Sequence, residues 1–164
     1  MIAGGMNAPT SNPSSANTWT ISLGVEDAHA AVSKVEPNGG EVHHGVTDVA
    51  TLGKMAIVGD PSGATIGILQ PGEHKGFSIF DENGASGYFE LHTTEFSKSI
   101  AFYERVFGIS MNVVSDTDDF RYNTAGVEGS TAMGFIDVTR IQGEDHASKW
   151  YWDARVNDCD ETRR

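Results

Sequence analysis

A stretch that occurs twice constrains the fold of this chain more than any other feature. Residues 20–35 and residues 88–103 each run from an alternating strand pattern into a helix pattern. At a constant offset of 68 residues, Leu23 aligns with Leu91 and Gly40 aligns with Gly108. Such self-similarity at a fixed period is the signature of a repeated structural unit. The chain is therefore predicted to hold two copies of one unit.

The first copy, residues 18–71, has the pattern of a strand, a helix and three further strands. Alternation from Trp19 to Val25 predicts the first strand, and Asp27 is placed to cap the helix that follows. The pair Gly39-Gly40 ends that helix. Three extended segments complete the unit, at residues 41–46, 54–58 and 65–69.

The second copy, residues 87–139, repeats the order strand, helix and three strands. Thr94 is placed to cap its helix, which carries an apolar stripe and ends at Gly108. Residues 72–86 form a glycine-rich linker with a candidate short strand at residues 77–80. The three later strands are expected near residues 110–114, 120–124 and 132–138.

Fragments of two more units flank these copies. Residues 149–164 match the start of a unit, because Trp150 aligns with Trp19 at an offset of 131. Residues 1–8 resemble the last strand of a unit, and a polar linker at residues 9–17 follows them. Incomplete units leave apolar strand faces bare, and such faces usually meet a partner. The pattern predicts a homodimer through the incomplete terminal units.

Composition and charge exclude several classes of function. The net charge of −12 disfavours nucleic acid as a partner, because its phosphates would be repelled. The chain has no apolar run near the roughly 20 residues that a membrane-spanning helix needs. Residues 1–6 lack the pattern of a secretory signal, and Cys159 is a single cysteine without an internal partner. We expect a cytoplasmic protein with neither a nucleic-acid nor a membrane partner.

The tandem βαβββ pattern, with Phe102-Tyr103 in a helix that ends at Gly108, resembles the vicinal oxygen chelate superfamily. This superfamily includes glyoxalase I, the bleomycin and fosfomycin resistance proteins and the extradiol dioxygenases. Residues 53–76, with Asp60-Pro-Ser-Gly63, resemble one branch more closely, the two-domain glyoxalase-like proteins of actinobacteria, some of which are described as hydroxylases. The resemblance implies an α+β fold in which tandem βαβββ units form a curved mixed sheet around a cleft.

The resemblance also names the positions where the superfamily's enzymes hold a divalent metal, one on the first strand and one on the last strand of each unit. The first-strand positions are Thr20, Tyr88 and Tyr151, and the last-strand position of the first copy is Gly67. Residues 132–135 hold the matching position of the second copy and offer no ligand either. Zinc, nickel, manganese and iron sites use imidazole and carboxylate ligands. We therefore expect no metal cofactor.

Alternation places Tyr88, Glu90 and His92 on the cleft face of one strand. Glu90 or His92 is a candidate catalytic acid or base, with the Tyr88 hydroxyl orienting a substrate oxygen. In the alternative interpretation, Glu90 and His92 pair with each other or with solvent at the end of the strand. The expected ligand-binding residues on the other strands of the cleft are Thr20, Ser22, Gly67 and Tyr151.

The favoured hypothesis is a protein that binds a small oxygenated or aromatic molecule in the cleft without the superfamily's metal. One alternative is a metal-dependent lyase or dioxygenase with shifted ligands, drawn from Glu90, His92 and another histidine. A second alternative is a non-catalytic antibiotic-sequestering protein. An enzyme of this kind would be a lyase or an oxidoreductase.

Overall fold

The computed structural model describes residues 19–73, 75–127 and 130–162, so the strand and linker expected at residues 1–17 lie outside the described part. The first half forms a four-stranded sheet, here called sheet A, with strand order β1-β4-β3-β2. β1 runs parallel to β4, and the other neighbours are antiparallel. Its elements are β1 (Ser22–Gly24), α1 (Ala28–Ser33), β2 (Glu41–Val49), β3 (Gly53–Gly59) and β4 (Thr65–Pro71), with single 3-10 turns at Glu36–Asn38 and Ala50–Leu52.

The second half forms a five-stranded sheet, sheet B, with strand order β6-β7-β8-β5-β9. β5 runs parallel to β8, as β1 runs parallel to β4, so the two halves share one topology. β9 adds an antiparallel strand to the free edge of β5. The elements are β5 (Ser86–Thr93), α2 (Phe96–Phe107), β6 (Asn112–Asp116), β7 (Arg121–Val127), β8 (Ser130–Asp137), α3 (Thr139–Gln142), β9 (Lys149–Ala154) and α4 (Cys159–Thr162).

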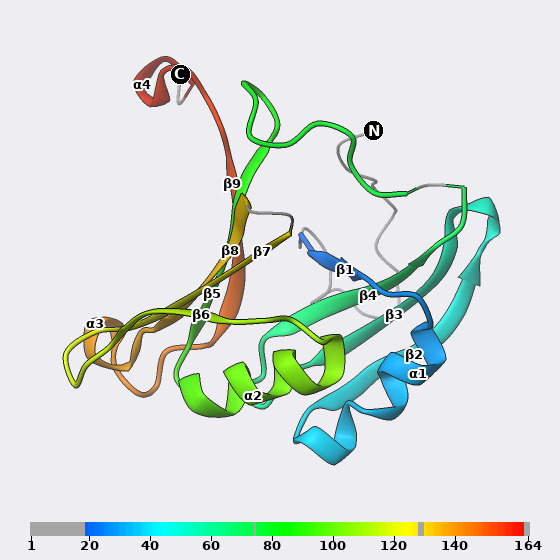
Figure 1. The fold of residues 1–164 in the computed structure, drawn as a ribbon, viewed down its shortest axis with the longest axis horizontal. Coiled ribbons are helices and arrows are strands. Elements are labelled where there is room, and N and C mark those ends of the chain that lie inside the picture. The colour runs from blue at the N-terminus through cyan, green and yellow to red at the C-terminus, as the bar shows by residue number, and fades with distance from the viewer. Residues whose placement is uncertain (1–18, 74, 128–129, 163–164) are drawn as a thin grey trace.

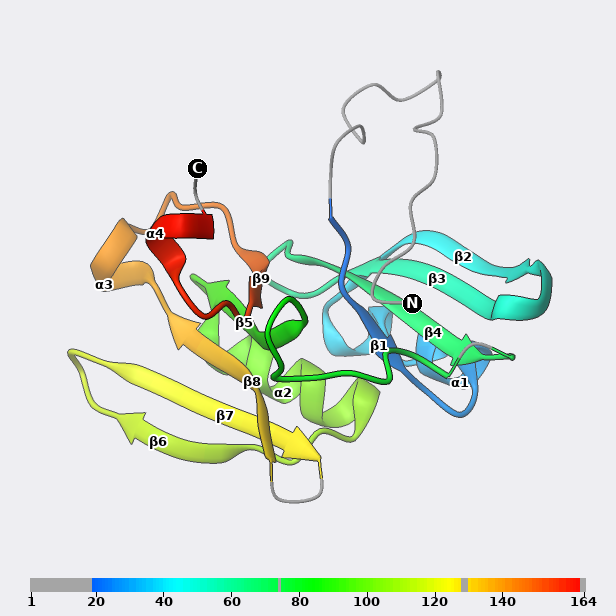
Figure 2. The same cartoon turned by 90° about the horizontal axis from the view of Figure 1, so that it is seen from above.

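The predicted α+β class is confirmed, with a helix after the first strand of each half (Figure 1). The strands form two curved mixed sheets rather than one continuous sheet (Figure 2). β2 and β6 lie at the outer ends of the two sheets. None of the described helices is long and apolar enough to cross a membrane.

The helix ends follow the sequence signals in part. The prediction that the pair Gly39-Gly40 ends the first helix was wrong, because α1 already ends at Ser33 with Lys34 as its C-cap, and Gly39 ends the 3-10 turn at Glu36–Asn38 instead. The Asp27 carboxylate accepts hydrogen bonds from the backbone N–H groups of His29 and Ala30, and Gly108 ends α2 with φ 68° in the left-handed region. The prediction that Thr94 caps α2 was wrong. The Thr93 hydroxyl accepts the Glu95 N–H instead, while the Thr94 hydroxyl bonds to Ser148.

The candidate strand at residues 77–80 is also absent from the structure, where this segment is irregular. The rings of Phe77 and Phe80 lie 6.0 and 6.4 Å from the ring of Phe89 in β5. Ring packing against Phe89, rather than backbone pairing, therefore holds this part of the linker to the sheet.

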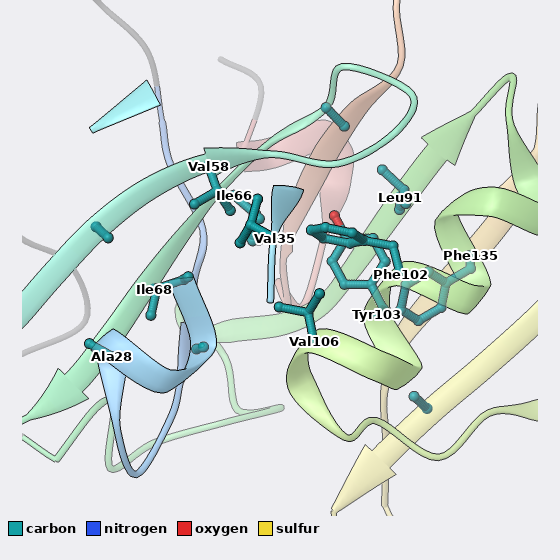
Figure 3. Close-up of a cluster of buried hydrophobic side chains, with 14 of the residues drawn as sticks. Ala28, Val35, Val58, Ile66, Ile68, Leu91, Phe102, Tyr103, Val106 and Phe135 are labelled. Carbon is teal, nitrogen blue, oxygen red and sulfur yellow. The ribbon is translucent and has the colours of Figure 1, made fainter. Parts of the chain in front are cut away.

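A single hydrophobic cluster lies between the helices and both sheets (Figure 3). Tyr103 of α2 is fully buried near its centre, with its ring 5.4 Å from the ring of Phe135. The indole N–H of Trp150 in β9 donates to the Tyr103 hydroxyl at 2.8 Å. This bond connects β9 to the helix that covers sheet B.

Candidate functional site

A chain of hydrogen-bonded side chains crosses one face of sheet B, opposite the face that packs on α2. The Tyr88 and Tyr122 hydroxyls lie 2.9 Å apart, and the Tyr122 hydroxyl donates to Glu90 Oε2 at 2.8 Å. Glu90 Oε1 lies 2.8 Å from Nε2 of His92. We call Tyr88, Tyr122, Glu90 and His92 the polar row. β5 contributes three of its members and β7 contributes Tyr122.

The strand alternation predicted for β5 is confirmed, because Leu91 is buried in the core on the opposite face from the polar row. Glu90 and His92 pair with each other, as the alternative interpretation expected. Their side chains retain exposed fractions of 24% and 20%, so a molecule in solution can reach the pair.

The direction of the hydrogen bonds in the polar row is fixed by the number of protons. Tyr122 has one hydroxyl proton and donates it to Glu90, so the Tyr88 hydroxyl must donate to Tyr122. Burial raises the pKa of Tyr122 far above its ordinary value, and its bonds to Tyr88 and Glu90 add to the rise. Burial likewise raises the pKa of Tyr88. Both phenols therefore stay protonated at neutral pH.

His92 carries a buried polar atom that lacks a hydrogen-bond partner among the described residues, its Nδ1. When Nε2 donates to Glu90, Nδ1 of the neutral ring is an acceptor that needs a donor. The ring of Tyr151 lies 4.2 Å from the imidazole ring, and Lys149 Nζ lies 4.8 Å from the Tyr151 ring. Tyr151 therefore covers the end of the polar row.

Gly134 of β8 makes room for the polar row. It lies beside Glu90 in the parallel pairing of β5 and β8. A Cβ atom at this position would lie 2.3 Å from the Tyr122 hydroxyl oxygen and 2.8 Å from that of Tyr88. A side chain at this position would therefore displace the hydroxyl groups of Tyr122 and Tyr88.

Alkaline titration of the tyrosines is expected to show the raised pKa values directly. Burial raises the pKa values of Tyr88, Tyr103 and Tyr122 above 10.0, at which an ordinary tyrosine is half ionised. At that pH the folded chain, with four tyrosines, should show no more than about half of the phenolate absorbance of the chain in denaturant. The folded state keeps protons that the unfolded state loses, so the free energy of unfolding should fall as the pH rises above 10.

Equal phenolate absorbance in the folded and unfolded chains at pH 10 would contradict these assignments. A Tyr122→Phe variant is the control, because it removes one of the late-ionising phenols. The absorbance that appears early in the titration should be unchanged in this variant, and the late amplitude should shrink.

The residues predicted to bind ligand lie on two different sheets. Tyr151 lies with the polar row on sheet B, whereas Ser22 and Gly67 face each other across β1 and β4 of sheet A. Thr20 is exposed just before β1. No hydrogen bond between described residues joins Ser22 or Thr20 to the polar row.

Comparison with known proteins finds relatives of this chain by sequence. No family model matches the chain. CFP32 of Mycobacterium tuberculosis (strain CDC 1551 / Oshkosh), which carries a provisional glyoxylase name, is 29% identical over 144 residues, covering 88% of this chain and 54% of that protein. The anthracycline biosynthesis protein DauV of Streptomyces sp. (strain C5) is 30% identical over 148 residues, covering 89% of this chain and 52% of that protein.

These relatives, named for a glyoxylase and for anthracycline biosynthesis, point to the vicinal oxygen chelate superfamily that the sequence resembles. It spans about half the length of the curated relatives it matches. Among solved structures, the antibiotic binding protein TnmS3 from Streptomyces sp. CB03234 aligns with a TM-score of 0.40 at 16% identity, covering 74% of this chain and 96% of that chain.

The superfamily's metal can be tested against the side chains at its ligand positions. In sheet B these positions hold Tyr88, whose pKa is raised by burial, and Gly134, which has no side chain. In sheet A they hold Thr20 and Gly67. The described residues contain no group of three or more His, Cys, Asp or Glu side chains that could hold a metal ion. The side chains present therefore do not fit the metal of this superfamily.

Two members of the site were missed by reasoning from the sequence, Tyr122 and Gly134. Tyr122 lies in the weakest of the predicted strands, so its face could not be read from alternation alone. Gly134 lay within the stretch named for the last-strand position, but its role depends on the two hydroxyl groups that fill its space. Both residues reach the site because strand pairing places them beside residues that lie far away in the sequence.

Proposed function

We propose that the polar row binds a small oxygenated aromatic molecule and does so without a metal. The observation that carries this proposal is the hydrogen-bonded sequence from Tyr88 through Tyr122 and Glu90 to His92. The row keeps acceptor capacity that no described residue uses, at the Tyr88 hydroxyl oxygen and at His92 Nδ1. A ligand that donates hydrogen bonds to these two atoms would satisfy them.

The unused hydrogen-bond acceptors of the polar row indicate which donor groups a ligand should carry. Tyr88 gives its proton to Tyr122, so its oxygen can accept a hydrogen bond from a ligand hydroxyl. His92 Nδ1 is a second free acceptor, buried beneath the ring of Tyr151. Two acceptors beside a carboxylate favour a ligand with hydroxyl or ammonium donors. Displacement of the Tyr151 ring by a flat aromatic ligand would expose the imidazole and replace one ring contact with another.

The names of the relatives narrow the class of ligand further. DauV is named an anthracycline biosynthesis protein, and an anthracycline is a flat polycyclic aromatic molecule with phenol and quinone oxygens. Such a molecule offers both the hydroxyl donors and the ring that the polar row and Tyr151 can use. We therefore take daunorubicin, a fluorescent anthracycline with an amino sugar, as the probe.

Titration of the chain with daunorubicin is expected to quench the fluorescence of the probe to saturation. Glu90→Gln should weaken this binding by roughly tenfold or more, because loss of a charge-assisted hydrogen bond costs about 1.5–3 kcal/mol. Glu104→Gln is the matched control, since Glu104 lies on α2 and outside the polar row. It removes the same charge and should leave the affinity unchanged.

Two results would reject this proposal. One is a failure of the wild-type chain to quench the probe at any accessible concentration. The other is an equal loss of affinity in Glu90→Gln and Glu104→Gln, since this would trace binding to net charge rather than to the polar row.

The geometry of Glu90 and His92 supports acid–base chemistry as a second function. His92 Nδ1 could accept a proton from a bound hydroxyl group, and the Glu90 carboxylate would then stabilise the imidazolium through Nε2. Mass spectrometry of the probe after incubation tests for turnover. A product that the wild type forms and His92→Gln does not form would support catalysis, whereas unchanged probe would leave binding alone as the function.

A further inference from the structure

Asp60 is a buried acidic residue at the place where the two halves of the chain meet. It lies in the turn between β3 and β4, and only 4% of its surface is exposed. α2 of the second half packs closely here, because a Cβ atom on Gly40 would lie 2.6 Å from Cε2 of Phe102. Side chains of both halves, such as Val35 and Phe102, share one core (Figure 3). Any charge on Asp60 is therefore held away from water.

The two oxygens of the Asp60 carboxyl group have different surroundings. Oδ1 accepts three hydrogen bonds within the turn, from the Ser62 N–H at 2.8 Å, the Ser62 hydroxyl at 2.6 Å and the Ala64 N–H at 3.1 Å. Oδ2 is buried and has no hydrogen-bond partner among the described residues. The turn thus uses one oxygen, and the other is a buried polar atom whose hydrogen-bonding capacity the turn does not use.

The groups that face Asp60 from the other elements are hydroxyls rather than cations. The Ser99 and Tyr103 side chains of α2 both lie near enough to be coupled to its ionisation. Among residues 19–73, 75–127 and 130–162, no Lys, Arg or His forms an ion pair with Asp60. His43 of β2 lies over the neighbouring Gly59 instead. The site therefore offers hydrogen-bonding groups to the carboxyl group but no opposite charge.

These surroundings favour the protonated form of Asp60. Burial raises its pKa above the ordinary value of 3.8, and hydrogen bonds from the turn and from Ser99 offset only part of the rise. Between 3.8 and the raised pKa, the folded chain holds a proton that the unfolded chain has lost. The stability that this proton contributes is fully present below 3.8 and is lost as the pH rises through the raised pKa.

We propose that Asp60 is a pH-sensitive latch that holds the two halves of the chain together. With a proton on Oδ2, the carboxyl group can donate a hydrogen bond to the Ser99 or Tyr103 hydroxyl and so connects the β3–β4 turn to α2. The ionised group can accept from the same hydroxyls, but the loss of water around the charge outweighs these bonds and weakens the contact. An asparagine would serve the turn equally well through its Oδ1, so only the response to pH needs an acid here.

Asp60→Asn tests the latch, because its amide keeps Oδ1 and places a permanent neutral donor where Oδ2 stands. Urea unfolding between about pH 5 and about pH 8 measures the midpoint of both proteins. The variant should unfold at a higher urea concentration than the wild type at the upper end of this range. Its advantage should shrink as the pH falls, because the wild type then gains the proton that the amide imitates.

Asp48→Asn is the matched control, because it removes the same charge from the same half. The Asp48 carboxylate is exposed, and its hydrogen bond with Lys54 at 2.7 Å lowers its pKa. This variant should unfold at the same urea concentration as the wild type or at a lower one throughout the range. A gain in midpoint as large as that of Asp60→Asn would trace the effect to net charge and overturn the proposal.

Amide hydrogen exchange tests whether ionisation loosens the contact itself. The Ala64 N–H donates to Asp60 Oδ1, so its exchange reports on the turn. After correction for the intrinsic effect of pH, this amide should exchange faster in the wild type as Asp60 ionises, and Asp60→Asn should show no such change. Nuclear magnetic resonance titration of the carboxyl group gives the pH of ionisation. A pKa at or below 3.8, or equal protection of Ala64 in both proteins at every pH, would overturn the proposal.

Discussion

Replacement of Tyr103 by alanine is expected to lower the free energy of unfolding by about 3–5 kcal/mol, as for other large-to-small changes at buried aromatic residues. Tyr103 is fully buried, and its ring lies 5.5 Å from the ring of Trp150 and 5.4 Å from that of Phe135. Its removal opens a cavity between α2 and sheet B. It also leaves the Trp150 indole N–H without the hydroxyl that accepts its proton.

Urea unfolding followed by tryptophan fluorescence measures this loss, because Trp150 reports on the same contact. Tyr103→Phe is the control: it keeps the ring and removes only the acceptor of the Trp150 N–H, so it should cost about 1–3 kcal/mol. A loss of less than about 1.5 kcal/mol in Tyr103→Ala would show that the core does not depend on this residue.

Gly134→Ala is expected to abolish saturable binding of daunorubicin while the chain stays folded. The new Cβ atom would lie 2.3 Å from the Tyr122 hydroxyl, 2.8 Å from the Tyr88 hydroxyl and 3.0 Å from Glu90 Oε2. These atoms are the ends of side chains, so they can move and the strand need not. Their movement breaks the hydrogen bond between Tyr122 and Glu90, so the polar row is no longer continuous.

Gly67→Ala provides a matched control for this substitution. Gly67 is the equivalent position of sheet A, and its Cβ atom would lie 2.3 Å from the Ser22 hydroxyl, away from the polar row. Fluorescence titration should show wild-type affinity for Gly67→Ala and no saturation for Gly134→Ala. Wild-type affinity in both variants would place the binding surface elsewhere.

The order of elements was predictable because each half of the chain repeats the same local signals. The Asp27 cap, the glycine at the end of α2 and the alternation through Leu91 each depend on neighbours in sequence. Local signals were insufficient at Thr94, because α2 has Glu95 at its N-cap and no side-chain hydrogen bond caps it. The Thr94 hydroxyl bonds to Ser148, a contact between residues far apart in the sequence that local signals do not reveal.

The candidate site was predictable only along a single strand. Tyr88, Glu90 and His92 share a face because strands alternate, and that part of the prediction needed no knowledge of the rest of the fold. Tyr122 joins them through the pairing of β7 with β8, in which Tyr122 lies opposite Ile136. This register depends on the irregularities between β7 and its neighbours, which local sequence does not specify.

The placement of Ser22 and Gly67 on another sheet than the polar row has a similar origin. The sequence located the first strand of each unit but not which first strands pair. In the structure β5 takes β9 as its neighbour, so the strands of the two halves lie in different sheets. Strand pairing over long distances in sequence is set by the whole fold, and alternation within a strand carries no information about it.

The one-way order of the two phenolic protons makes the polar row sensitive to the ionisation state of its guest. Both protons run toward Glu90, so the outer end presents lone pairs beside a carboxylate. A phenol can donate to that end, whereas the phenolate made from the same molecule offers no proton and meets negative charge. The polar row would thus distinguish a phenol from its phenolate although the two have the same shape. It would release a bound phenol as the pH rises above the pKa of that phenol.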